Sequence, residues 1–199
     1  MPGQLTTIPP LALTMGEPAG IGGELTLKVW KKLRNSLTVF FVIDCPERLR
    51  RISESLSLDV SIQSITSPEE ASVCFKNALP VIPLRLAEDV CPGVPSPKNG
   101  RSVLSSIEKC VAFVKSGQAS ALVTNPINKA ILYEAGFRHP GHTEYLAELA
   151  GTNSASVMML ASEQLRVVPV TIHLSLQEAI KTLDENLIQH TIRTTNIAL

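Results

Sequence analysis

The 199-residue sequence lacks three features: an excess of charge of either sign, a long apolar run, and closely spaced cysteines. Its 18 basic and 18 acidic residues cancel, which removes the electrostatic reason to expect nucleic acid or an anionic membrane as a partner. No apolar run approaches the roughly 20 residues of a membrane-spanning helix. The first ten residues, MPGQLTTIPP, carry no basic segment ahead of an apolar stretch, so they do not predict a signal peptide.

The four cysteines are Cys45, Cys74, Cys91 and Cys110, and they lack the close pairs that zinc sites favour. We therefore expect reduced thiols in a cytoplasmic protein, each with a packing role. Hydrophobic residues make up 44% of the sequence, which is enough to build a sizeable core at this length.

Short apolar runs alternate with amphipathic patterns along the chain. We expect strands at 11–15, 38–44, 59–65, 80–84, 121–125, 156–161 and 166–173. We expect helices at 20–35, after Cys45, at 103–117, from Asn125-Pro126 to about 135, at 142–151 and at 184–199, with capping boxes at 67–70 and 175–178. The segment 90–100, rich in proline and glycine, is expected to be a loop or crossover. Alternating strands and helices predict an α/β fold with a largely parallel sheet.

Two segments that follow predicted strands could bind an anion. GEPAGIGGE (16–24) lies between a strand and a helix, where backbone amides attract anions and glycines permit close approach. It has neither the dinucleotide-binding glycine pattern nor the end of a P-loop, so on spacing alone a tight turn is the better interpretation. Lys129, in VTNPINKA (123–130), would lie near the strand tips and could meet a phosphate, although a solvated lysine is the commoner outcome.

Two further segments place histidines where chemistry is possible. In FRHPGHTEYL (137–146), His139 and His142 flank Pro140-Gly141, which is not a standard metal-ligand spacing. His142 and Thr143 could bind a ligand or merely cap the following helix. His173 ends an apolar run in VTIHLSL, a position that suits a metal ligand or a base, although a lone histidine is more often structural.

Taken together, five segments resemble the 4-hydroxythreonine-4-phosphate dehydrogenase family of pyridoxal phosphate biosynthesis. They are GEPAGIG (16–22), NPINKAILYEAGF (125–137), PGHTEYLAELAG (140–151), VMMLASEQLRV (157–167) and TIHLSL (171–176). The resemblance implies a two-lobed fold of the isocitrate/isopropylmalate dehydrogenase type and a homodimer that shares its active site between subunits. The first lobe would be 1–125, and 126–199 would be the beginning of an incomplete second lobe.

The resemblance also implies site residues and a reaction. His142 and Thr143 would bind substrate, His173 would bind a divalent metal ion, and His139 would have no role. The family oxidises 4-phosphooxy-L-threonine with NAD or NADP, and the product loses carbon dioxide. Neutral histidines suit zinc, with cobalt or magnesium as substitutes. The resemblance assigns no cofactor-binding or catalytic residue within this chain.

The family's chain is longer and supplies two further metal histidines beyond the segments matched here. The sequence therefore predicts an N-terminal part that is inactive alone, because catalytic zinc usually needs three protein ligands. Two other interpretations stay open: a dehydrogenase of a related 4-phosphorylated hydroxy acid, and a non-catalytic module that binds phosphate or dimerises.

Overall fold

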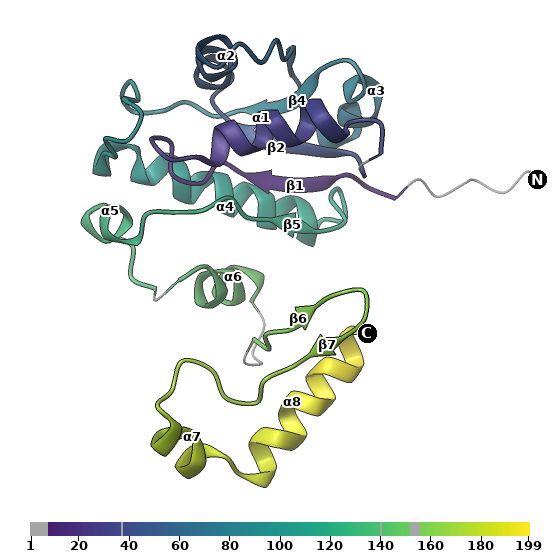
Figure 1. Cartoon of the computed structure of the whole chain (residues 1–199), viewed down its shortest axis with the longest axis vertical. Helices are drawn as coiled ribbons and strands as arrows, with labels where there is room; N and C mark the ends of the chain where they lie inside the picture. Colours follow the sequence, from purple (N-terminus) through teal and green to yellow (C-terminus); the bar gives the residue numbers. More distant parts are fainter. Residues whose placement is uncertain (1–7, 37, 140, 152–155) are drawn as a thin grey trace, which may run out of the picture. The chain divides into compact units, whose positions relative to one another are not determined.

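The computed structural model describes residues 8–36, 38–139, 141–151 and 156–199, which belong to two compact units divided between Ala150 and Gly151 (Figure 1). The predicted α/β class is confirmed. None of the helices within these ranges has the length and apolarity needed to span a bilayer.

The first unit is built on a five-stranded, all-parallel sheet with the strand order β3-β4-β2-β1-β5. Its strands are β1 (Leu11–Thr14), β2 (Phe40–Asp44), β3 (Ile62–Ser64), β4 (Leu79–Pro83) and β5 (Leu122–Val123). Every residue of β2 is buried. The unbroken apolar run predicts this, because a central parallel strand is covered on both faces.

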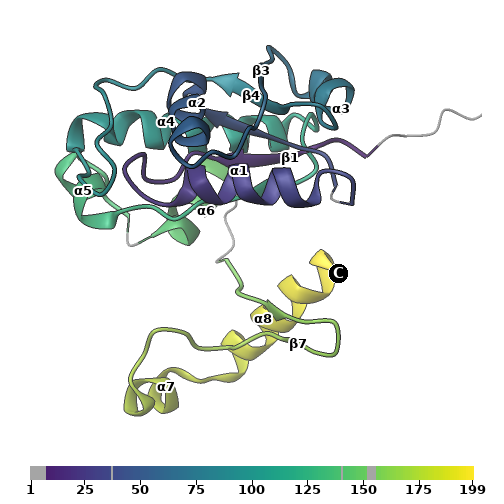
Figure 2. The same ribbon diagram turned by 45° about the horizontal axis from the view of Figure 1, so that its top comes forward.

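Helices cover both faces of this sheet (Figures 1 and 2). They are α1 (Gly22–Leu33), α2 (Pro46–Ser55), η1 (Pro68–Glu70), α3 (Ala71–Cys74), η2 (Pro97–Asn99), α4 (Gly100–Lys115), α5 (Lys129–Glu134) and α6 (His142–Ala150). On one face Trp30 of α1 and Leu49 of α2 pack with Val42. On the other face Cys110 of α4 packs with Ile43, since successive strand residues point to opposite sides.

The second unit contains a short hairpin and two helices. They are β6 (Leu160–Ala161), β7 (Arg166–Val167), α7 (Leu176–Thr182) and α8 (Glu185–Ala198). The capping box at Ser175 is confirmed: Ser175 Oγ accepts from the Glu178 amide at 3.3 Å, and Glu178 Oε2 accepts from the Ser175 amide at 3.1 Å. Asp184 caps α8 by accepting from the Leu187 amide at 2.7 Å.

Two predictions about elements were wrong. The strand expected at 166–173 ends at Val167 and pairs antiparallel with Leu160, so it does not extend a parallel sheet. The helix expected from Asn125-Pro126 begins at Lys129 instead. The prediction that every cysteine packs was also wrong, because Cys91 is exposed; all four thiols are free.

Candidate functional site

The turn after β1 is fixed against the chain that follows β5. Gly16 has φ +70°, and a Cβ added there would lie 2.7 Å from both Asn125 Cβ and the Pro126 carbonyl oxygen. Only glycine avoids both the left-handed strain and the overlap. The Glu17 amide donates to the Pro126 carbonyl at 2.8 Å, and the turn then leads into α1, as GEPAGIG predicts.

Asn125 connects three elements through its hydrogen bonds. Its amide N–H donates to Thr14 Oγ1 at 3.0 Å, and its Nδ2 donates to the Thr14 carbonyl at 2.9 Å and to Thr26 Oγ1 at 3.1 Å. Asn125 is not the cap of α5, because that helix begins four residues later, at Lys129. The cap of α5 is Asn128, whose Oδ1 accepts from the Ile131 amide at 3.3 Å. The expected helix start was wrong because both asparagines satisfy the local capping rule.

His142 is the first residue of α6 and is partly buried. Its Nε2 is buried without a hydrogen-bond partner among the described residues. Burial lowers the pKa of His142, and the positive charge of Lys129 lowers it further. The imidazole is therefore neutral at pH 7, and its Nε2 has a hydrogen-bonding capacity that no described residue satisfies. A buried polar atom without a partner calls for such an explanation.

Lys129 and Thr143 lie at the same end of α6. A Cβ built on Gly141 would lie 3.4 Å from Lys129 Nζ and 3.5 Å from Glu144 Oε2, so both side chains reach the residue preceding the helix. Thr143 is the exposed second residue of α6 and not the residue before it, which rules out the capping alternative. Free amides at a helix start, together with an ammonium group, suit an anionic ligand.

Tyr145 anchors this end of α6 to α4. Its side chain is buried, and its hydroxyl donates to Glu108 Oε1 at 2.9 Å. Burial, followed by the hydrogen bond to Glu108, raises the pKa of Tyr145. His139 lies against the Phe137 and Tyr145 rings, with centroid distances of 5.2 and 5.0 Å. These contacts give His139 a packing role and account for its position without a ligand.

His173 belongs to the second unit, so the structure does not place it relative to His142. It is exposed, has φ +57° and lies between β7 and α7, six residues after the last strand residue. The expectation that it ends a strand was therefore wrong. Within the described parts of the chain, no three His, Cys, Asp or Glu side chains are grouped to hold a metal ion. These residues alone do not compose a metal site.

Sequence reasoning missed three contributors to the architecture of this region: Asn125, Glu108 and Tyr145. The sequence places Asn125 before a proline, which favours a local capping interpretation. Thr14 and Asn125 are 111 positions apart and Glu108 and Tyr145 are 37 apart, so no local pattern could pair them.

The parallel sheet with helices on both faces defines a doubly wound α/β unit, a class in which ligands usually bind beside the carboxyl ends of the strands. Comparison with known proteins gives the family. The profile of the family described as Pyridoxal phosphate biosynthetic protein PdxA matches residues 36–199, and the chain belongs to this family.

The relatives agree with this assignment. A 4-hydroxythreonine-4-phosphate dehydrogenase of Bradyrhizobium diazoefficiens is 44% identical over 196 residues, which cover 92% of this chain and 56% of that protein. The crystal structure of such an enzyme from Burkholderia phymatum matches with a TM-score of 0.87 and 32% identity, covering 96% of this chain and 58% of that one. A terephthalate 1,2-cis-dihydrodiol dehydrogenase from Burkholderia xenovorans, at 21% identity and a TM-score of 0.64, shares the fold. The chain spans about half the length of the curated relatives it matches.

Proposed function

We propose that the chain supplies the substrate-binding part of an NAD- or NADP-dependent dehydrogenase acting on 4-phosphooxy-L-threonine in the cytoplasmic synthesis of pyridoxine 5′-phosphate. The observation that carries this proposal is the buried, unpartnered Nε2 of His142 at the start of α6, close to the charge of Lys129. The names of the relatives support the substrate and the reaction class. The oxidised product is a β-keto acid that loses carbon dioxide.

The residues at the start of α6 contact different groups of the substrate. The neutral imidazole of His142 hydrogen-bonds a polar group of the substrate, and the Thr143 hydroxyl adds a second contact. The Lys129 ammonium group and the free amides of the first turn favour the phosphate or the carboxylate. The dinucleotide, when bound, supplies the hydride acceptor.

We propose His173 as one ligand of a divalent ion, with zinc, cobalt or magnesium as candidates. We propose that the remaining ligands come from residues outside this sequence; the described side chains form no three-ligand group. Accordingly, this chain alone should bind zinc weakly and show no dehydrogenase activity.

We further propose two lobes, with the boundary at 125/126, in a homodimer that shares its active site. The exposure of the second unit supports this proposal, because among residues 156–199 only Thr191 is buried. Exposed apolar side chains there include Leu174, Leu176 and Ile180. An apolar surface of this kind normally packs against further polypeptide.

The test is calorimetric titration of 4-phosphooxy-L-threonine into a chain with the full length of the relatives. His142→Ala should weaken substrate binding about tenfold or more, since a hydrogen bond to a charged group contributes roughly 1.5–3 kcal/mol. Metal content should stay unchanged. His139→Phe is the matched control, because it keeps an aromatic ring against Phe137 and Tyr145. Loss of metal in His142→Ala with unchanged substrate affinity would reverse the assignment.

A second candidate is a non-catalytic module that binds phosphate or dimerises. One observation favours this candidate. The described residues place Lys129 at the start of α6, where an anion can bind, but they form no group of three metal ligands. Phosphate binding by the 199-residue chain, with no turnover in a chain extended to the relatives' length, would support this candidate. Turnover in the extended chain would support the dehydrogenase. The turnover rates of related 4-phosphorylated hydroxy acids would then identify the substrate.

A further inference from the structure

The sheet has two places where neighbouring strands lead to helices on opposite faces. From β1 the chain enters α1 on one face, whereas the chain after β5 enters α5, which packs through Leu132 on the α4 side. From β2 it enters α2, whereas after β4 it leads to α4 on the opposite face. Crevices at such switch points are where open α/β sheets bind ligands.

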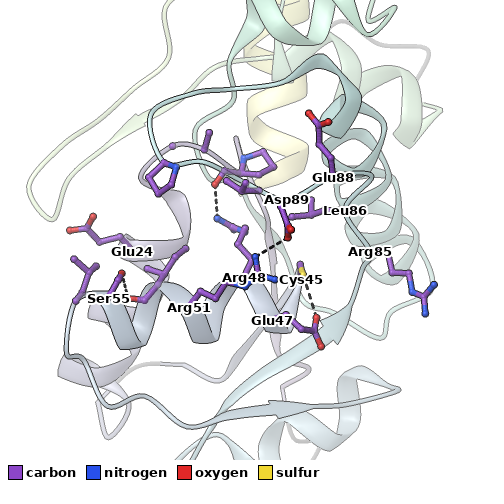
Figure 3. A pocket seen from close by; sticks show the side chains of 17 residues that line it. Glu24, Cys45, Glu47, Arg48, Arg51, Ser55, Arg85, Leu86, Glu88 and Asp89 are labelled. Carbon is purple, nitrogen blue, oxygen red and sulfur yellow. Dashed lines mark hydrogen bonds and ion pairs between the residues drawn. The ribbon is translucent and has the colours of Figure 1, made fainter.

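At the switch point between β1 and β5, Asn125 packs against the turn after β1, because its Cβ and the Gly16 backbone approach as closely as glycine allows. Beside the tips of β2 and β4 lies a cavity of about 690 Å³ (Figure 3). Cys45 and Arg48 line it after β2, and Leu86 and Asp89 line it after β4. This volume is within the roughly 300–1,000 Å³ typical of small-molecule sites.

Two of the three arginines that line this cavity are already paired. Arg48 donates to both carboxylate oxygens of Asp44, at 3.1 and 2.5 Å, and to the Pro18 carbonyl at 2.9 Å. Arg51 pairs with Asp89 at 2.8 Å. Figure 3 draws Arg48, Arg51 and Asp89 among the side chains that line the cavity. Arg48 and Arg51 are engaged in this way, and the lining also carries four carboxylates, so the cavity does not favour a polyanion as its buried occupant. The carboxylates belong to Glu24, Glu47, Glu88 and Asp89.

The uncharged part of the lining suits a flat heteroaromatic group. The apolar walls come from three segments and comprise Pro18, Ala19, Ile52, Leu86, Val90 and Pro92. Glu47 stands at the opening with an exposed carboxylate that can accept from sugar hydroxyls. Asp44 ends β2, but it is buried and bound to Arg48, so it is not available for that role.

We propose that this cavity binds the adenosine portion of a dinucleotide, with the base between the apolar walls and the ribose hydroxyls facing Glu47. The choice of a dinucleotide rests on the proposed dehydrogenase function. The site of His142 at the start of α6 uses none of the residues that line the cavity, so the two binding events are separable by experiment.

Cys45 provides a reporter inside the cavity. It is partly buried, and burial raises its pKa. Cys74, on α3, is also partly buried with a pKa raised by burial, but it does not line the cavity. The two thiols therefore form a matched pair for alkylation of the 199-residue chain with iodoacetamide, followed by digestion and mass spectrometry of the peptides that carry each cysteine.

With ADP-ribose as the probe at about ten times its Kd, the alkylation rate of Cys45 should fall about tenfold while that of Cys74 stays constant. Ser55→Trp, which fills the cavity from an exposed position on α2, should abolish the protection. Glu54→Trp, its exposed neighbour that does not line the cavity, should preserve it.

Unchanged Cys45 reactivity at millimolar ADP-ribose would overturn the proposal, as would equal protection in Ser55→Trp. Protection by nicotinamide mononucleotide but not by AMP would overturn the adenosine assignment. Titration of 4-phosphooxy-L-threonine in the same samples tests the other site. Failure there with Cys45 protection intact would refute the proposed substrate and leave the nucleotide site standing.

Discussion

Asn125→Ala tests whether this side chain connects β1, α1 and the segment after β5, or merely caps a helix. The substitution removes two hydrogen bonds, from Nδ2 to the Thr14 carbonyl and to Thr26 Oγ1. Thr26 keeps its bond to the Gly22 carbonyl at 2.9 Å, but the buried Thr14 carbonyl loses a donor. Two net hydrogen bonds of about 1 kcal/mol each, plus part of an unsatisfied-acceptor cost of about 1–3 kcal/mol, give a destabilisation of about 3 kcal/mol.

Asn128→Ala is the matched control, because it removes the cap of α5. It should cost about 1 kcal/mol, the usual loss for an N-cap asparagine. The local sequence pattern predicts the opposite ranking of the two substitutions. If Asn125 were the cap, Asn125→Ala would destabilise by about 1 kcal/mol, whereas Asn128→Ala, inside the helix, would destabilise little.

Urea unfolding followed by tryptophan fluorescence measures this difference. Trp30 is the sole tryptophan and is fully buried in the first unit, so its emission reports the unit that contains both asparagines. The midpoint should fall further for Asn125→Ala than for Asn128→Ala, with slopes equal to the parent's. An equal or smaller shift for Asn125→Ala would refute the connecting role.

Two further predictions concern single residues of the first unit. The folded-state pKa of His142 lies below its ordinary 6.5, so the unfolded chain binds more protons as pH falls through 6.5. The stability of the first unit should therefore decline below that pH, and His142→Gln should flatten the decline in unfolding midpoints measured between pH 5 and 8. Gly16→Ala should destabilise by about 2 kcal/mol or more, because it combines left-handed strain with backbone overlap. Gly117→Ala, at φ +73° with open space around it, should cost only about 1 kcal/mol, and equal unfolding midpoints for the two variants would contradict the overlap argument.

The sequence predicts most of the first unit, because local patterns there agree with the tertiary structure. The run containing Phe40–Asp44 is apolar throughout and forms the fully buried central strand. The capping box at Ser67 is also confirmed, although the turn it starts is a 3-10 helix followed by one turn of α-helix.

The failures come from contacts that local patterns cannot specify. The residues 166–173 are rich in valine and isoleucine, which favour extended chain, but the strand ends at Val167, opposite Leu160, the first residue of its hairpin partner. His173 consequently lies in an irregular segment and not at a strand tip. The hydrogen bonds between Asn125 and Thr14 depend on two segments meeting that are 111 positions apart in the sequence.

The candidate site was predictable only in part. The sequence places His142 at a helix start, and the structure confirms this position. The sequence does not predict that Lys129 reaches Gly141, the residue before α6, as the structure shows. It does not reveal that His142 Nε2 is buried without a partner, because that depends on how α5 and α6 pack. The roles of His142, Thr143 and His173 stay predictions until a ligand is bound.

The most direct test of the account is the imidazole resonance of His142 in a ¹⁵N-labelled chain titrated with 4-phosphooxy-L-threonine. The account predicts a saturable shift of the His142 Nε2 signal, with a neutral ring in the free protein and no comparable shift at His139, which is packed against aromatic rings. A silent His142, or a response confined to His139, would contradict the central claim that the start of α6 is the substrate site.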